Sequence, residues 1–540
     1  MDASPPANTA AAPQHGPEEA AAPAAIEDAH VFLPELWAGF AEFQPRKTAL
    51  VCDGVRRDWA GFNAGMNRVA NRLNAAGIGR GDRVAVVMAN SVAMLEVMFG
   101  VVKAGACVVP LSAMLTGEQI AALAADAGAR ALFASAGLHE ALEPHRRRLS
   151  GIDPGLWFLY GAAAPGWQEL EAWLAGAPEH QPAVRYEMED EFNIIYSSGT
   201  TGLPKGIVQT HRARQHFAWS NALEMRYHRN TVALATTPLY SNGTFLTMLP
   251  TLFVGGTLVA MPAFDPLAFL QTVAREKVTH SFMVPTQFIV TLAHPDFGRY
   301  DLSSLEAVLS AGSPLRLDTK KAVIERMTPN LYEIYGISEG VASIIRPDMV
   351  MRKPGSVGTP VVGYHIAIIG PDDAPLPHGE VGEIVGYGAG MMKRYNRRPD
   401  ATAEIVWRDA RGRTYLRTGD IGRMDEDGYL YILDRKKDMI ISGGFNIFPA
   451  DLEQVIGSHP AVMDVTVIGI PHEKWGETPL ALVIREEAAA ADEAEILAWA
   501  NERLGRHQRV SAVTFRDDFP RNALGKVLKR ELREPYWRDA

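Results

Sequence analysis

The stretch Tyr196-Ser-Ser-Gly-Thr-Thr-Gly-Leu-Pro-Lys-Gly206 is the most informative part of the chain, and it follows a short apolar run of strand type. Its glycines allow backbone N–H groups to approach an anion closely, its hydroxyls add donors, and Lys205 adds positive charge. This combination predicts a polyphosphate-binding loop, although an ordinary Gly/Ser turn between strands is the alternative. A Walker A loop is excluded because Lys205 stands between Pro204 and Gly206, with no Ser or Thr after the lysine.

Length and composition indicate a soluble globular protein of two or more domains. The chain has 540 residues, with 47% apolar and 21% charged residues. A formal net charge of -10 argues against nucleic acid as the main partner. Cys52 and Cys107 are the two cysteines, too few for a disulfide framework or a cysteine-rich zinc site, so we expect a cytoplasmic protein.

Two segments bear on targeting. Residues 1–29 are rich in Ala and Pro and contain no Lys or Arg, which predicts a disordered leader rather than a signal peptide. The longest apolar run, near 244–262, is interrupted by Pro250, Gly255 and Gly256. It predicts a helix followed by a strand in a buried core, and no membrane span.

Strand and helix signals alternate from residue 82, which predicts an α/β fold of parallel sheets covered by helices. Ser91 is a predicted helix cap, and Thr116 with Gln119 has the spacing of a capping box. The predicted strands are 83–89, 107–111, 130–135, 231–237, 257–261 and 279–284.

The later part of the chain divides differently. Glycine-punctuated short β runs predict a small β-barrel-like subdomain at about 356–433, with a hairpin turn at Asp425–Gly428. Strands at 462–468 and 479–484 and a helix near 496–504 predict a small α+β domain. We therefore expect a disordered leader at 1–29, a large domain at 30–434, a hinge at 434–438 and a small domain at 435–540.

Five segments in register resemble the adenylate-forming enzymes, which include acyl-CoA synthetases, firefly luciferase and peptide-synthetase adenylation domains. They are 196–206, Tyr335-Gly-Ile-Ser-Glu339, Tyr415-Leu-Arg-Thr-Gly-Asp420, Asp434-Arg-Lys-Lys-Asp438 and Pro520-Arg-Asn-Ala-Leu-Gly-Lys526. The resemblance implies that a carboxylate attacks the α-phosphate of ATP, pyrophosphate leaves, and a thiol then displaces AMP from the acyl-adenylate. It also implies ATP, Mg²⁺ and coenzyme A as cofactors, and a small domain that rotates about a pivot near Lys437.

The resemblance assigns the nucleotide-binding residues. The β- and γ-phosphates would be held by Ser197, Ser198, Gly199, Thr200, Thr201, Gly202 and Lys205. Glu339 and Thr200 would bind Mg²⁺, which takes one or two carboxylates plus phosphate oxygens. Tyr335 would stack on adenine, with Gly336 and Ser338 nearby and the Gly312-Ser313-Pro314 backbone on the other edge of the base; an aromatic residue of the core is the alternative for Tyr335. Asp420 would accept both ribose hydroxyls, and Arg435 would add a second ribose or phosphate contact.

Lys526 is the predicted catalytic lysine. By resemblance it reaches across the domain interface to the substrate carboxylate and the α-phosphate, where an ammonium lowers the barrier between two anions. A surface lysine is the alternative. The same segment resembles a site of reversible lysine acetylation, which implies a lysine acetyltransferase as a partner.

The acceptor and acid sites are predicted less directly. Gly443 and Gly444 in Ser442–Asn446 are the candidate wall of the thiol channel, and a plain turn is the alternative. The acid pocket is expected to be apolar and to accept a fatty or aryl carboxylate. Its predicted residues are Trp219, Tyr240, Asn242, Phe245, Thr286, Ala311 and Ile337. Asn242 stands where many relatives have a histidine or aromatic gate.

The sequence motifs are compatible with three functions. The first is an AMP-forming acid–CoA ligase. The second is a stand-alone adenylating enzyme that loads a separate carrier protein. The third is a non-catalytic nucleotide-binding regulator.

Overall fold

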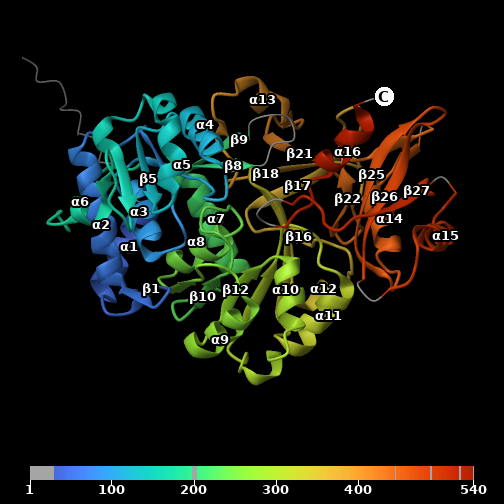
Figure 1. Cartoon of the computed structure of the whole chain (residues 1–540), viewed down its shortest axis with the longest axis horizontal. Helices are drawn as coiled ribbons and strands as arrows, with labels where there is room; N and C mark the ends of the chain where they lie inside the picture. The colour runs from blue at the N-terminus through green and yellow to red at the C-terminus, as the bar shows by residue number, and fades with distance from the viewer. Residues whose placement is uncertain are drawn as a thin grey trace, which may run out of the picture.

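The computed structural model describes residues 30–197, 204–443, 445–486, 489–506, 508–521 and 525–538. Its helices and strands form four sheets, and the chain runs from the N-terminal sheets to a separate C-terminal sheet at the opposite end of the molecule (Figure 1).

The first large sheet has eight strands, in the order β19-β9-β8-β4-β3-β5-β6-β7. Strands β4, β3, β5, β6 and β7 run parallel beside β8, and β9 and β19 add antiparallel pairs at one edge. The bounds are β3 Arg83–Val87, β4 Cys107–Pro110, β5 Ala131–Ser135, β6 Trp157–Tyr160, β7 Gln168–Glu169, β8 Glu191–Ser197, β9 Lys205–Thr210 and β19 Arg394–Tyr395.

The helices of this region begin where their caps predict. Ser91 accepts a hydrogen bond from Met94 N (3.1 Å), and Thr116 and Gln119 form the expected capping box. The helices are α1 Leu33–Phe43, α2 Trp59–Ala75, α3 Val92–Lys103, α4 Gly117–Ala127, α5 Leu138–Leu142 and α6 Leu170–Leu174, with 3₁₀ turns at Glu143–Leu149 and Pro154–Leu156.

The second large sheet has nine strands, in the order β16-β15-β14-β13-β12-β10-β11-β1-β2. Its six central strands are parallel, and antiparallel strands close both edges. The strands are β1 Thr48–Cys52, β2 Val55–Asp58, β10 Val232–Ala235, β11 Thr257–Ala260, β12 His280–Met283, β13 Ala307–Ser310, β14 Leu331–Ile337, β15 Val341–Ile345 and β16 Thr359–Pro360.

One hydrophobic core joins the two large sheets. It contains Trp37, Phe99 and Phe245, none of them exposed, together with residues of β3 and β11. The apolar run near 244–262 forms a helix and then a strand, as predicted. The helices around the second sheet are α7 His211–Glu224, α8 Phe245–Phe253, α9 Pro266–Glu276, α10 Pro285–Leu292, α11 Leu317–Arg326 and α12 Pro347–Val350, with a 3₁₀ turn at Phe297–Arg299.

Two smaller sheets complete the molecule. The β-rich region forms an antiparallel sheet of β17 Tyr364–Ile369, β18 Gly382–Gly388, β20 Val406–Arg408, β21 Thr414–Met424 and β22 Leu430–Arg435, with α13 Pro399–Glu404 beside it. Its predicted hairpin turn lies between β21 and β22. The short strands β16 and β19 fall within 356–433 but pair with the large sheets.

The C-terminal sheet starts only a few residues after β22 ends. It consists of β23 Ile440–Ser442, β24 Phe445–Ile447, β25 Val462–His472, β26 Gly476–Arg485 and β27 Ala512–Phe515, with helices α14 Pro449–Ile456, α15 Glu493–Arg503 and α16 Lys529–Trp537. Its core is separate from the others. The α/β fold class, with a small α+β domain at the C-terminal end, is confirmed.

A search of the described helices for membrane spans finds none with the length and apolar content needed to cross a bilayer.

Candidate active site

The predicted phosphate loop connects two paired strands. Strands β8 and β9 are antiparallel, and Tyr196 pairs with Gly206 and Ser197 with Lys205. The Tyr196 hydroxyl donates to Asp126 Oδ2 (2.7 Å), which ties the base of the hairpin to α4. The predicted residues Ser198, Gly199, Thr200, Thr201 and Gly202 lie outside the described residues, and so does Gly444.

Tyr395 links the two ends of the phosphate site. Its hydroxyl donates to Glu339 Oε1 (2.6 Å), and the Lys205 ammonium lies 4.8 Å from the centre of its ring. Burial, with help from Glu339, raises the pKa of Tyr395, so the phenol stays neutral and donates. Strand β19 positions Tyr395 by pairing with β9. Tyr395 was not predicted from the sequence, because nothing in its local sequence marks it.

Glu339 lies where the backbone after β14 passes close to the backbone at Gly390–Met392. Met392 N donates to the Glu339 carbonyl (2.7 Å), and the next residue, Gly340, has φ +105° with no room for a side chain against the Gly390 carbonyl. Among the described residues, no group of three or more His, Cys, Asp or Glu could hold a metal. A single carboxylate nevertheless fits Mg²⁺, because this ion binds chiefly to phosphate oxygens and water.

Asp420 is the centre of a second cluster. It is buried, its Oδ2 accepts from the Tyr335 hydroxyl (2.6 Å), and its Oδ1 lies 2.9 Å from Arg435 Nε. Asp420 and Arg435 are register partners on β21 and β22, and Tyr335 is on β14 of the neighbouring sheet. Burial and the nearby Asp420 raise the pKa of Tyr335.

The segment proposed for the other face of adenine follows β13, the neighbour of β14. Ser310 pairs with Glu333, so Gly312-Ser313-Pro314 continues beside the Tyr335-Gly336 segment. Ser338 directly follows the end of β14. Its carbonyl accepts from Gln209 Nε2 (2.7 Å). The structure therefore brings together the three motif segments that were predicted for adenine and ribose.

Lys526 lies next to the Asp420 cluster, although the two are more than 100 residues apart. Solvent reaches its side chain, yet protein surrounds it closely enough that desolvation is the main cause lowering its pKa to about 8. Arg435 and Lys437 lower the pKa further, and Asp420 and Asp438 oppose them. The neighbouring Gly525 faces α10 of the large domain, because a Cβ at this glycine would lie 3.7 Å from Thr286 Oγ1.

The predicted thiol segment lies elsewhere on the small domain. Gly443 has φ +57° and packs against Trp475, and Gly443 N donates to the Trp475 carbonyl (2.8 Å). Phe445 is 61% exposed. Lys437 is exposed between the two domains, and its carbonyl accepts from Arg533 Nη1 (3.1 Å).

A cavity of about 150 Å³ lies beside the Tyr335–Glu339 segment. Among the residues predicted for the acid pocket, Asn242, Ala311 and Ile337 line it, and so do Gly312, Gly336 and Ser338. Apolar residues cover much of the remaining wall, namely Ala213, Phe217, Leu246, Phe282, Ile334, Val341, Ala342 and Val361.

Four residues predicted for the pocket do not line this cavity. Phe245 is buried in the core, Trp219 packs on His216, the Tyr240 hydroxyl faces Met114 Sδ (3.8 Å), and Thr286 faces Gly525. In the sequence, Phe245, Trp219 and Tyr240 lie within two residues of residues that do line the cavity.

The cavity wall is also less apolar than expected. Arg214 of α7 lines it and is 1% exposed. Its Nε donates to Asn193 Oδ1 (2.7 Å) and its Nη2 to Asn242 Oδ1 (2.9 Å), and Asn242 Nδ2 donates to Ser338 Oγ (3.2 Å). Burial lowers the pKa of Arg214 to about 9, so it remains charged at neutral pH. Arg214 was not predicted from the sequence, where its one signal is a charge within a largely buried helix.

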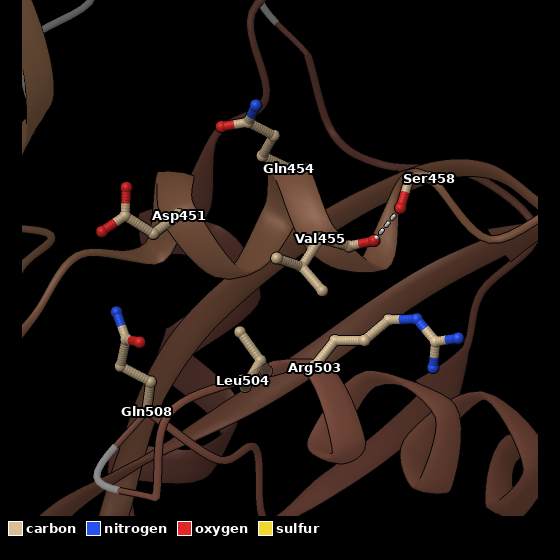
Figure 2. Close-up of a pocket in the computed structure, with 7 residues that line it drawn as sticks. All are labelled: Asp451, Gln454, Val455, Ser458, Arg503, Leu504 and Gln508. Atoms are coloured by element: carbon tan, nitrogen blue, oxygen red, sulfur yellow. Dashed lines mark hydrogen bonds between the residues drawn. The ribbon is translucent and has the colours of Figure 1, made fainter.

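A second, more open hollow of about 620 Å³ lies on the small domain between α14 and α15 (Figure 2). Asp451, Gln454 and Val455 of α14 line it, together with Arg503 at the end of α15 and Leu504 directly after it. It contains none of the predicted site residues.

Comparison with known proteins identifies the class. The AMP-binding enzyme family matches residues 38–396, and its C-terminal domain family matches residues 451–526. The chain belongs to the AMP-binding enzyme family of adenylate-forming ligases.

Individual relatives agree with this class. The chain is 35% identical over 499 residues to the feruloyl-CoA synthase of an Amycolatopsis species, covering 92% of this chain and 97% of that protein. It is 34% identical over 508 residues to the long-chain-fatty-acid–CoA ligase FadD13 of Mycobacterium tuberculosis, with the same two coverages. The protein is therefore an AMP-forming acid–CoA ligase that activates a carboxylic acid through an acyl-adenylate and uses ATP, Mg²⁺ and coenzyme A.

Solved structures resemble the chain over nearly its whole length. ATP-bound MatB from Rhodopseudomonas palustris is 30% identical and superposes with a TM-score of 0.84, covering 94% of this chain and 100% of that one. The apo structure of MatB, with the same identity and coverages, superposes with a TM-score of 0.74.

Proposed function

We propose that this arrangement of the two domains is the one that forms the acyl-adenylate, and that Lys526 is its catalytic lysine. The observation that carries the proposal is the position of Lys526 beside the Asp420–Tyr335–Arg435 cluster. An ammonium there meets both the acid carboxylate and the α-phosphate, and it stabilises the charge as the two anions approach. The closer superposition on ATP-bound than on apo MatB supports the same arrangement.

The remaining residues take roles that follow from their contacts. Asp420 accepts the ribose hydroxyls, and Tyr335 and Arg435 hold its two oxygens in place. Lys205 contacts the phosphates, and Glu339 binds Mg²⁺ while Tyr395 orients its carboxylate. Mg²⁺ supplies charge neutralisation of the phosphates when bound. The Gly312–Pro314 backbone and the Tyr335-Gly336 segment enclose adenine.

The second half-reaction needs a different arrangement. The Ser442–Asn446 hairpin, proposed to contact the pantetheine arm, presents Phe445 to solvent while Lys526 occupies the site. Rotation about the hinge at 434–438 would withdraw Lys526 and bring this hairpin inward. The domain division at 434/435 is part of this proposal.

Separating the half-reactions of Lys526→Ala tests the assignment. We expect acid-dependent ATP–pyrophosphate exchange to fall by at least about 100-fold, equivalent to roughly 3 kcal/mol. Thioester formation from preformed acyl-AMP should be nearly unchanged. Lys321→Ala, at an exposed lysine of α11, is the control and should retain both activities. Normal adenylation in Lys526→Ala would reject the role.

Free coenzyme A is the acceptor of acid–CoA ligases, and the assay below tests whether a separate carrier protein replaces it. The cytoplasm is the proposed compartment. Thioester formation with free coenzyme A at micromolar concentration supports this acceptor. Acyl transfer only to a phosphopantetheinyl carrier protein would favour the second candidate. Both cysteines are buried and unbonded, which suits a reducing compartment.

Acetylation of Lys526 is a proposed control point, because it would remove the charge needed for the first half-reaction. Solvent access to the side chain would allow modification. Stoichiometric acetylation should abolish adenylation and leave thioester formation from acyl-AMP. Full adenylation by the acetylated enzyme would refute the idea.

A further inference from the structure

Arg214 carries a buried positive charge into the wall of the acid cavity. It is 1% exposed, and its two hydrogen bonds go to the neutral amides of Asn193 and Asn242. The ring of Phe245 packs against the guanidinium at 4.7 Å. Within the described part of the chain, no Asp or Glu forms an ion pair with this guanidinium.

A buried charge without an opposite charge is costly, so a partner for Arg214 is to be expected from outside the chain. Protein amides satisfy some of its donors but do not neutralise it. A cavity ligand reaches it directly, because Arg214 and Asn242 are both part of the cavity wall.

The reacting carboxylate is a poor candidate for this partner. That group loses its negative charge when its oxygen bonds to the α-phosphate and pyrophosphate leaves. A strong ion pair with it would stabilise the bound acid more than the transition state, and so would slow the reaction. An anion that survives the reaction pairs equally well with Arg214 before and after adenylation.

We propose that the acid substrate carries a second carboxylate, which does not react and pairs with Arg214. This inference rests on the proposed function, since it takes the cavity as the acid site. The reacting carboxylate lies toward Ser338 and the nucleotide. The second carboxylate accepts from Arg214, and the apolar wall of Phe217, Leu246 and Phe282 packs on the carbon skeleton.

The volume of the cavity limits the size of this acid. An apolar cavity of about 150 Å³ holds one benzene molecule. The skeleton between the two carboxylates is therefore a short aliphatic chain or a single ring.

Matched acids test the proposal directly. Acid-dependent pyrophosphate release is measured with succinate, glutarate and isophthalate, and with butanoate, pentanoate and benzoate as the corresponding monoacids. We expect the wild-type kcat/KM to be at least about tenfold higher for the diacid in one or more pairs, because a monoacid leaves Arg214 unpaired.

Two variants separate recognition from folding. Arg214→Met keeps the apolar stem and removes the charge, so it should lose at least about tenfold on the preferred diacid and less than about threefold on its monoacid. Arg214→Lys keeps the charge and should retain the preference. If Arg214→Met does not fold, the wild-type comparison of the pairs still decides the question.

The contrary results are specific. Wild-type enzyme that favours the monoacid in every pair overturns the inference. An equal loss on both members of a pair in Arg214→Met also overturns it, and would mean that Arg214 only positions Asn242. Efficient monoacid activation leaves the proposed function intact, whereas pyrophosphate release with none of these acids, nor with longer fatty or aryl acids, contradicts it.

Discussion

At the scale of single residues, the site depends on charged groups whose partners lie far away in the sequence. Lys526 comes from the tail, Asp420 and Arg435 from the antiparallel sheet, and Tyr335 from the second large sheet. Tyr335 and Arg435 hold the Asp420 carboxylate in position, and Asp420 and Arg435 both act on the pKa of Lys526. Two consequences can be measured.

The first concerns pH. Desolvation lowers the pKa of Lys526 to about 8, so the ammonium is present below this value and is lost above it. Since adenylation needs the charged form, kcat/KM for acid-dependent pyrophosphate release should fall as pH rises through about 8. Lys526→Arg, which stays charged, should show less activity but no such limb. An identical alkaline limb in this variant would assign the titration to another group.

The second concerns Tyr395. Replacing it with phenylalanine removes the hydroxyl that donates to Glu339 and leaves the ring beside Lys205. A hydrogen bond to a charged group contributes about 1.5 to 3 kcal/mol, so we expect a roughly tenfold or greater loss in kcat/KM for MgATP. Tyr431→Phe is the matched control, because Tyr431 also donates to a carboxylate, that of Asp425 (3.3 Å). Equal behaviour of both variants would contradict the role of Tyr395.

At the scale of elements, strand β22 and helix α14 form the joint between the domains. Asp434, near the end of β22, accepts hydrogen bonds from Arg435 N (2.6 Å) and from Ala450 N of α14 (3.0 Å). The side chain is buried, and burial raises its pKa to about 6. The joint therefore contains a carboxyl that is protonated more readily in the folded protein than in the unfolded chain.

This joint should make stability depend on pH. The stabilisation from protonated Asp434 is complete below about pH 4 and is lost as pH rises through about 6, a change of about 3 kcal/mol. Urea unfolding of wild type and Asp434→Asn at pH 4 and pH 7 measures it. The variant should lack this part of the pH dependence. Parallel curves for the two proteins would show that Asp434 does not titrate in this range.

Elements with local signals could be predicted from the sequence. Ser91 and Thr116 cap helices because capping needs only neighbouring residues, and the β-branched runs at 83–89 and 107–111 form buried strands. The placement of β19 beside β9 could not be predicted, because a two-residue strand has no periodicity. Tyr395 was missed for that reason.

The acid cavity shows the same limit. Its wall depends on which face of α7 and α8 turns inward, and sequence proximity to a motif does not determine this. Thus Phe245 does not line this cavity, whereas Arg214, which was not predicted, does. The structure brings together the motif residues Asp420, Tyr335 and Lys526, as expected. They could be predicted because their motifs occur in this chain in the same order as in the family that it resembles.

At the scale of the whole molecule, the central claim is that one chain uses two domain arrangements in turn. In this structure Gly525, next to Lys526, faces Thr286 of the large domain, while Phe445 of the predicted thiol segment is exposed. In the proposed cycle the ammonium and the thiol segment occupy the site in turn. The proposal therefore requires the small domain at the right of Figure 1 to move between the two half-reactions.

A reversible cross-link between the domains tests this claim most directly. In the double variant Thr286→Cys and Gly525→Cys we expect a disulfide, because a Cβ at position 525 would lie 3.7 Å from Oγ1 of Thr286. The native Cys52 and Cys107 are buried. The single variants are the controls for the strain of a side chain at Gly525, whose φ is +76°.

The measurement compares both half-reactions of the double variant before and after reduction with dithiothreitol. The account predicts that the oxidised enzyme makes acyl-AMP at close to the reduced rate but forms almost no thioester, and that reduction restores it. Two results would contradict the alternation of two domain arrangements. One is full thioester formation by the cross-linked enzyme, and the other is a loss of adenylation that appears in the cross-linked enzyme but not after reduction.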